Sequence, residues 1–231
     1  MTPFIRPYAP ADRDAVVDIC VRTAWHGEDA RGRVATPELY AEIWALPYLE
    51  LAPDLAFVLD AGDEAGADGG PGAGAAGDGA DDGGRRVLGY VMGVADTAVF
   101  RAAAERDWFP AARERHPRSA SEDPTDSWLL DILHTPAGPE PEYLAPYPAH
   151  LHIDLLPEAQ GGGWGRRLLE TLFDALRARG VPGVHLGASD RNERAISFYK
   201  HLGMTQLATP PGVVHLALPL DPPHHPTPSP K

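Results

Sequence analysis

The chain has 231 residues, enough for one domain of ordinary size, and 43% of them are hydrophobic, enough for a real core. Its formal net charge of −13 argues against nucleic acid and anionic lipid as partners. The single cysteine, Cys20, excludes an intramolecular disulfide. Neither a signal peptide nor an apolar run of about 20 residues is visible, so we expect a cytoplasmic protein without a membrane span.

The negative charge is concentrated in one segment. Residues 61–84 contain six Asp or Glu residues, ten glycines and no lysine or arginine, which leaves −7 for the rest of the chain. Such a segment buries too little apolar surface to offset its ordering entropy, so we expect a flexible insertion in a hairpin turn. The remaining acidity would attract a cationic partner such as an amine, or would serve solubility alone.

Strand and helix patterns alternate in the first 60 residues. Thr36 and Pro37 are typical of an N-cap and of a first helical position. The predicted elements are a strand over 3–8, a helix over 11–24, a helix from Pro37 to about Trp44 that ends near Pro47, and a buried strand over 55–59.

The middle of the chain is predicted to pair one strand and then leave the sheet. A strand over 86–94 should pair with 55–59 across the insertion. Residues 96–116 have a helical pattern that Pro110 interrupts. Residues 117–148 carry seven prolines among apolar anchors, so we expect an ordered but irregular excursion.

The last third of the chain alternates strands and helices again. We predict a strand over 150–156, a helix over 164–179, a strand over 184–186, a helix over 192–201 and a strand over 213–218. The proline-rich tail, residues 221–231, should be disordered. This order predicts one mixed α/β domain over 1–220, with a central sheet and helices on both faces.

One junction stands out, where the 150–156 strand enters a glycine-rich turn that opens a helix. Bare N–H groups and a helix N-terminus at one place suit a phosphate or pyrophosphate. The spacing fits neither the dinucleotide fingerprint, because Arg166 or Leu168 stands where the last glycine is needed, nor a P-loop, because arginines follow Gly165. The strand also places His150, His152 and Asp154 on one face, because side chains alternate.

Two motifs together resemble those of the GNAT N-acetyltransferases. Gln160-x-x-Gly163-x-Gly165 lies between the strand and the helix, about 30 residues before a helix that runs from Asn192 through Tyr199. The resemblance implies a GNAT fold, whose mostly antiparallel mixed sheet is splayed at the fourth strand, and it implies acetyl-CoA. The 96–148 excursion would then lie near the acceptor site.

The resemblance also assigns a coenzyme A site. The main chain of Leu155 and Leu156 would pair with the pantetheine arm, which requires a splay after Leu155, and an N–H near these residues would polarise the carbonyl oxygen. N–H groups from Gly161 to Arg166 would hold the pyrophosphate. The full set of cofactor residues implied is Leu155, Leu156, Gln160, Gly161, Gly162, Gly163, Trp164, Gly165, Arg166, Asn192 and Tyr199.

Acetyl transfer to an amine needs a base and an acid. Tyr199 is the acid candidate, and the base is one of His150, His152 and Asp154. The segment from His150 to His152 resembles the His-Leu-His of the arylalkylamine N-acetyltransferases, where histidines pass the proton through water. We read His185 and His215 as structural, and we expect no metal, because no third ligand follows the histidine pair at a definite spacing.

An acceptor pocket should combine carboxylates with aromatic rings, which suit an amine through charge and cation–π contact. The candidates are Trp25, Glu28, Asp29, Tyr48, Asp107, Trp108, Trp128 and Asp131.

The sequence thus predicts an acetyl-CoA-dependent N-acetyltransferase that acts on a primary amine, a small molecule or lysine, in a ternary complex, as a monomer or homodimer. Segments around Asp54, His150 and His185 also resemble the acetyltransferase-like domain of O-GlcNAc hydrolases and its free-standing bacterial counterparts. The alternative is therefore a GNAT-fold module that binds acyl-CoA, or nothing, without catalysis. A larger acyl donor such as succinyl-CoA is a third reading.

Overall fold

The computed structural model describes residues 2–62, 86–119, 123–136, 138–139 and 141–220. The predicted insertion at 61–84, apart from its first two residues, and the predicted tail at 221–231 lie outside the described residues.

The described residues form a seven-stranded sheet in the order β1-β2-β3-β4-β5-β7-β6. Its strands are β1 (Phe4–Pro7), β2 (Ala56–Asp60), β3 (Val87–Val94), β4 (Ala149–Leu155), β5 (Gly183–Ser189), β6 (Thr205–Ala208) and β7 (Val213–Pro219). Neighbouring strands are antiparallel except β4 and β5, which are parallel. The mixed, mostly antiparallel sheet is the predicted one.

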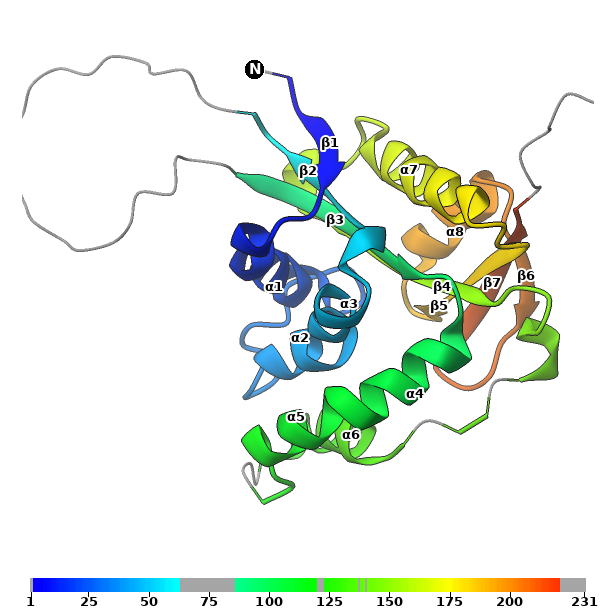
Figure 1. Ribbon diagram of the computed structural model, residues 1–231. Coiled ribbons are helices and arrows are strands. Elements are labelled where there is room, and N and C mark those ends of the chain that lie inside the picture. Colours follow the sequence, from blue (N-terminus) through cyan, green and yellow to red (C-terminus); the bar gives the residue numbers. More distant parts are fainter. Residues whose placement is uncertain (1, 63–85, 120–122, 137, 140, 221–231) are drawn as a thin grey trace, which may run out of the picture.

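Helices cover both faces of this sheet (Figure 1). They are α1 (Arg13–Thr23), α2 (Glu38–Trp44), α3 (Leu46–Leu51), α4 (Thr97–Asp107), α5 (Phe109–Arg115), α6 (Pro124–His134), α7 (Trp164–Ala178) and α8 (Glu193–His201). Short 3-10 helices lie at Pro10–Asp12, Pro53–Leu55, Glu142–Leu144 and Pro157–Ala159.

Two apolar cores follow from the two covered faces. One core joins α1, α2, α3, α5 and α6 to side chains of β2 and β3, including Val58, Tyr90 and Met92. The other packs α7 and α8 against the opposite face, with Leu168 and Leu172 fully buried. Side chains that alternate along β2 and β3 supply both cores, as period two requires.

Proline explains the helices that the sequence analysis missed. Pro47 was expected to end a helix, but it is the second residue of α3, where its missing N–H costs nothing. Residues 117–148 were expected to be irregular, but α6 lies within them. It begins at Pro124, and its N-cap Asp123 accepts from Thr125 N.

Two local predictions were also wrong. Thr36 does not cap α2, because Pro37 is the N-cap residue and the Thr36 hydroxyl donates to Asp126 of α6 at 2.8 Å. That bond instead ties the start of α2 to α6. The four-residue edge strand β6 was not predicted at all.

Candidate functional site

The site begins where β4 and β5 separate. Their parallel ladder holds two register pairs, Ala149 with Val184 and His150 with His185, and no pairing is described beyond them. The prediction placed the splay after Leu155, whereas the strands part directly after His150. Ile153 and Leu155 are therefore only partly buried, although their neighbours in the sheet are core residues.

At the end of β4, the main-chain groups of Leu155 and Leu156 point to opposite sides of the strand. Leu156 N donates to Leu88 O of β3 at 2.9 Å, so it faces away from the opening. Successive residues of a strand direct their N–H and C=O groups to opposite sides, so Leu155 faces the opening. Its carbonyl oxygen accepts from Gln160 Nε2 at 2.8 Å. Of the two main-chain donors predicted here, only the Leu155 N–H is directed at the opening.

The glycine-rich loop forms one end of this opening. Gly161 and Gly163 have φ angles of +82° and +77°, a backbone conformation that glycine adopts without strain. Gly163 is the N-cap of α7 and has no side chain to cap it, and the first N–H that finds a helical partner is Arg167 N on Gly163 O at 3.2 Å. The N–H groups of Trp164, Gly165 and Arg166 precede that bond, so they point out of the helix start.

The side chains of α7's first turn are arranged around its free N–H groups. The Arg167 guanidinium lies 4.6 Å from the centre of the Trp164 ring. The Arg166 side chain pairs with Glu170 at 2.9 Å on the exposed surface. A Cβ on Gly165 would approach the Phe198 ring of α8 to 3.1 Å, so glycine is needed there for close packing of the two helices.

Helix α8 brings Asn192 and Tyr199 to the same opening. Asn192 caps the helix, because its Oδ1 accepts from Ala195 N at 3.1 Å. Tyr199 is 8% exposed, and no described residue hydrogen-bonds to its hydroxyl. Burial, and to a lesser degree the Asp154 carboxylate, raises the pKa of Tyr199, so the phenol stays protonated.

A loop after α1 reaches across to this region. His26, with a φ of +56°, places its Nδ1 2.8 Å from Ser189 Oγ at the end of β5. A Cβ on Gly27 would meet the Asn192 amide at 3.1 Å. The loop therefore contacts both β5 and the start of α8.

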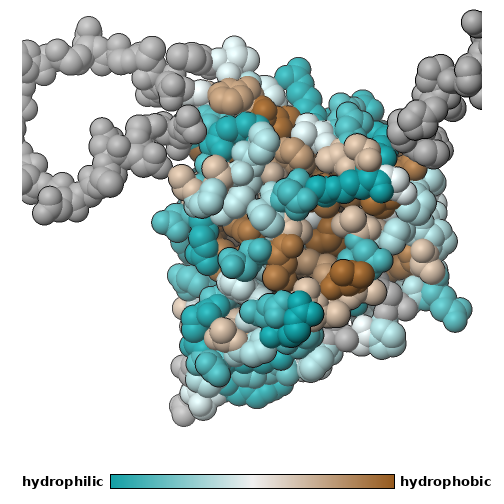
Figure 2. Space-filling view, viewed as in Figure 1, coloured by the Kyte–Doolittle hydropathy of each residue, from teal (hydrophilic) through white to brown (hydrophobic). Residues whose placement is uncertain are grey.

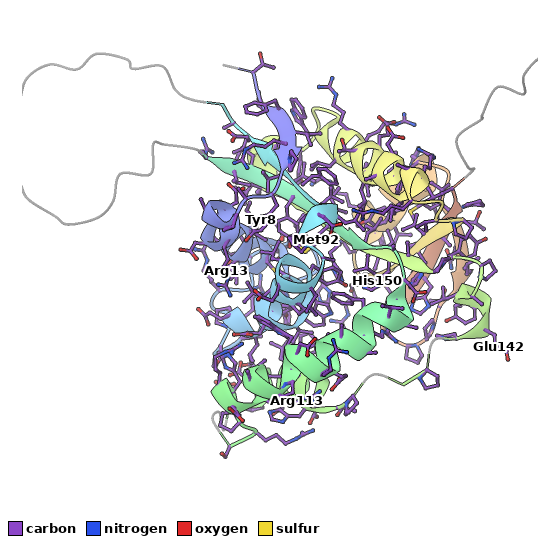
Figure 3. The ribbon with its side chains drawn as sticks, in the orientation of Figure 1. Tyr8, Arg13, Met92, Arg113, Glu142 and His150 are labelled. Atoms are coloured by element: carbon purple, nitrogen blue, oxygen red, sulfur yellow. The ribbon has the colours of Figure 1, made fainter. Side chains whose placement is uncertain are left out.

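The structure places His150, His152 and Asp154 on the face of β4 that α1, α3 and α4 cover, as predicted. Figure 3 shows His150 in the middle of the molecule, beside the start of α4. Its Nε2 lies 2.5 Å from Tyr48 Oη, and its Nδ1 lies 2.8 Å from Thr97 Oγ1. Both ring nitrogens are therefore engaged. Desolvation lowers the pKa of His150 well below its usual value.

His152 has a different environment. Its ring packs edge-on against Tyr48, with 5.2 Å between centroids, and no described residue hydrogen-bonds to either ring nitrogen. Desolvation lowers its pKa to about 4, so the ring is neutral at physiological pH. Among the three candidate bases, His152 alone makes no hydrogen bond to a described side chain, whereas His150 and Asp154 each do.

Asp154 belongs to a buried network beneath α1. Its Oδ2 accepts from Tyr90 Oη at 2.5 Å, and Thr23 and Cys20 lie beside this pair. Desolvation raises the pKa of Asp154. No feature of the sequence pointed to Tyr90 or Thr97 as partners of these residues, because both come from elements distant in the chain.

A cavity of about 830 Å³ adjoins His150 and His152. Leu151 and His152 of β4 and Leu186 and Gly187 of β5 line it, so it reaches the opening between the strands. Its outer wall comes from α2, α3, α4, α5 and α6 and from Thr135, Pro136, Gly138, Pro139, Pro141 and Leu144. Figure 2 shows apolar side chains gathered near the middle of the molecule's visible face. Described residues of the 96–148 excursion thus line this cavity.

Most residues predicted for the acceptor pocket do not line this cavity. Tyr48 and Asp131 line the cavity, and the other six do not. Trp108 donates to Glu42 O at 2.9 Å, and Trp128 stacks with Tyr40 and Trp44. The carboxylates of the remaining set pair with neighbouring arginines: Glu28 with Arg33, Asp29 with Arg31, and Asp107 with Arg106. Trp25 packs against His26.

No set of three or more His, Cys, Asp or Glu side chains in the described part of the chain is arranged to hold a metal ion. No helix within it is long and apolar enough to span a membrane.

Comparisons with known proteins agree on one family. Residues 135–204 match the Acetyltransferase (GNAT) family. The crystal structure of SsHAT is 40% identical in sequence, with a TM-score of 0.81 over 96% of this chain and 100% of that one. Rat Protein O-GlcNAcase is 24% identical over 207 residues, which is 88% of this chain but 20% of the rat protein. A phosphinothricin acetyltransferase from Sinorhizobium meliloti in complex with AcCoA is 17% identical, with a TM-score of 0.51 over 95% of this chain and 89% of that one.

Proposed function

Because this chain belongs to the GNAT family of acetyltransferases, we propose that it moves an acetyl group from acetyl-CoA to a primary amine by direct transfer in a ternary complex. The observation that carries the proposal is the opening between β4 and β5, which joins a free helix N-terminus on one side to a cavity with an unengaged imidazole on the other. A donor and an acceptor can meet there without a covalent enzyme intermediate.

The residues around the opening fit coenzyme A. Three N–H groups at the start of α7 suit a pyrophosphate, because the N-cap residue Gly163 has no side chain to accept from them. The Leu155 N–H lies on an unpaired strand edge, which suits an amide-bearing pantetheine arm. Tyr199 has a buried hydroxyl without a described partner, and such a group costs free energy unless a ligand satisfies it. Acetyl-CoA supplies an acetyl group activated as a thioester.

The protein's own residues divide the proton transfers. His152 accepts the proton from the attacking amine, directly or through one water, because its ring nitrogens are free and neutral. Tyr199 donates to the departing thiolate, because its phenol is protonated at physiological pH. The Leu155 N–H stabilises the carbonyl oxygen. His150 and Asp154 are engaged by other residues and hold no proton for the reaction.

Two measurements test the proposal in sequence. Titration calorimetry with acetyl-CoA should show binding, and absence of binding at high micromolar ligand would overturn it. A thiol-release assay with a panel of amines, including a lysine peptide, should then show acceptor-dependent turnover. Binding without turnover for any amine would instead favour the non-catalytic acyl-CoA module.

A further inference from the structure

Four groups behind the cavity form one continuous chain of hydrogen bonds. Thr97 Oγ1 lies 2.7 Å from Pro148 O and 2.8 Å from His150 Nδ1. His150 Nε2 in turn lies 2.5 Å from Tyr48 Oη. Thr97 is 3% exposed and Tyr48 is 4% exposed, so bulk water does not compete for these bonds.

The direction of every bond in this chain follows from its first member. The Pro148 carbonyl has no proton to give, so the Thr97 hydroxyl donates to it. The hydroxyl then has only lone pairs left for His150, so His150 Nδ1–H donates to Thr97. A neutral imidazole carries one proton, so Nε2 is bare and accepts from the Tyr48 hydroxyl.

We propose that this chain makes Tyr48 Oη a fixed hydrogen-bond acceptor for the amine substrate, with His150 and Thr97 as positioning residues. The proposal rests on the proposed amine acetylation. The Tyr48 proton is committed to His150, so the remaining lone pairs of its oxygen are what it offers to the cavity that both residues line. An oxygen that only accepts favours an N–H-bearing head group and disfavours a carboxylate or phosphate.

The surroundings hold Tyr48 in this role. Its ring lies 4.6 Å from the Phe100 ring and packs edge-on against both His150 and His152, at 5.4 and 5.2 Å between centroids. The Tyr48 oxygen therefore lies in the same cavity as the free imidazole of His152. An amine held by Tyr48 has its second N–H available to that base.

Nitrogen NMR of the histidine rings tests the direction of the chain without any assay of activity. Long-range proton–nitrogen spectra of the full chain, with His150 assigned by the loss of its signals in His150→Gln, should show His150 protonated at Nδ1. In Thr97→Val the acceptor for that proton is gone, so the Nε2–H form should appear, whereas Thr97→Ser should retain Nδ1–H. An Nε2–H ring in the wild-type protein would overturn the proposal.

Kinetics with the best amine of the panel tests the role of Tyr48. Tyr48→Phe should raise KM for the amine about tenfold or more, since a hydrogen bond to a charged or polar ligand is lost, while Kd for acetyl-CoA stays unchanged. Tyr143→Phe is the matched control, because it removes another phenol–imidazole contact, 2.9 Å to His215, at a partly exposed site. Its KM should change less than about twofold.

The outcomes separate the two proposals. An unchanged KM in a folded Tyr48→Phe variant, checked by thermal unfolding, would overturn the role of Tyr48 while leaving acetyl transfer intact. If no amine is acetylated by the wild-type protein, the proposed function fails, and the tautomer of His150 still decides whether the hydrogen-bond chain has the stated direction.

Discussion

The two faces of β4 carry different kinds of residue. Leu151, Ile153 and Leu155 face α7 and α8, where they join an apolar core. His150, His152 and Asp154 alternate with them and face α1, α3 and α4, where two of the three meet a specific polar partner. Apolar burial is non-directional, whereas a hydrogen bond to one ring nitrogen depends on the position and direction of its partner. The alternation of side chains along β4 therefore places residues that stabilise the core on one face and the candidate catalytic residues on the other.

The core face should respond to cavity formation. Leu172 is fully buried on α7, so Leu172→Ala should lower the free energy of unfolding by about 3–4 kcal/mol. Urea titration measures this loss. Glu170→Ala, on the exposed side of the same helix, should cost no more than about 0.5 kcal/mol. Equal losses of unfolding free energy in the two variants would mean that this face of α7 does not form part of the apolar core.

The polar face should make stability depend on pH. The pKa of His152 is about 4 in the folded protein and about 6.5 in an unfolded chain, so between these values only the unfolded state binds the proton. Stability is therefore fully present above pH 6.5 and falls as the pH drops toward 4, by about 3 kcal/mol for this residue. Lowering of the pKa of His150 acts in the same direction. Urea titrations at pH 7 and 4.5 should show a smaller loss in His152→Gln than in the wild type, and an equal loss would contradict the assignment.

Catalysis should depend on a residue across the opening from β4. Tyr199→Phe should lower kcat about 100-fold and leave Kd for acetyl-CoA nearly intact, because only the proton donor is lost. Tyr8→Phe is a matched control on the α1 side of the molecule (Figure 3), and its kcat should stay within about twofold. A Tyr199→Phe enzyme with normal kcat would assign the acid to another group.

The glycine loop should show the smallest effect. Gly161→Ala places an L-residue at a φ of +82°, so we expect about 1–2 kcal/mol of destabilisation together with weaker acetyl-CoA binding. Gly212→Ala introduces the same strain at a φ of +84° in a turn before β7, and it should cost similar stability with an unchanged Kd. Thermal unfolding measures the stability of both variants, and calorimetry measures their Kd for acetyl-CoA. Weaker acetyl-CoA binding in both variants would contradict a specific role of the glycine loop in binding.

Local sequence patterns predicted those parts of the candidate site that residues close together in sequence form. The β4–α7 junction and the cap of α8 at Asn192 depend on residues near one another in sequence, so spacing alone locates them. The rest of the site depends on contacts between distant segments. His150 contacts Thr97 and Tyr48, which lie 53 and 102 residues away in sequence, and no periodicity in the sequence predicts such contacts. Trp108 and Trp128 were grouped by residue type, yet both are held by contacts with α2, which lies more than 60 residues away in sequence.

The loop from Trp25 to Glu28 changes how the gap in the sheet should be pictured. Register pairs at His150 and His185 close one end of the gap, and the bond between His26 and Ser189 spans the other. β5 is thus held at both of its ends, by β4 at one end and by the loop after α1 at the other. The loop at His26 precedes the site by more than a hundred residues, yet its bond to Ser189 helps to set the separation of β5 from β4. Shortening the side chain at position 26 should therefore alter which ligands fit between the two strands.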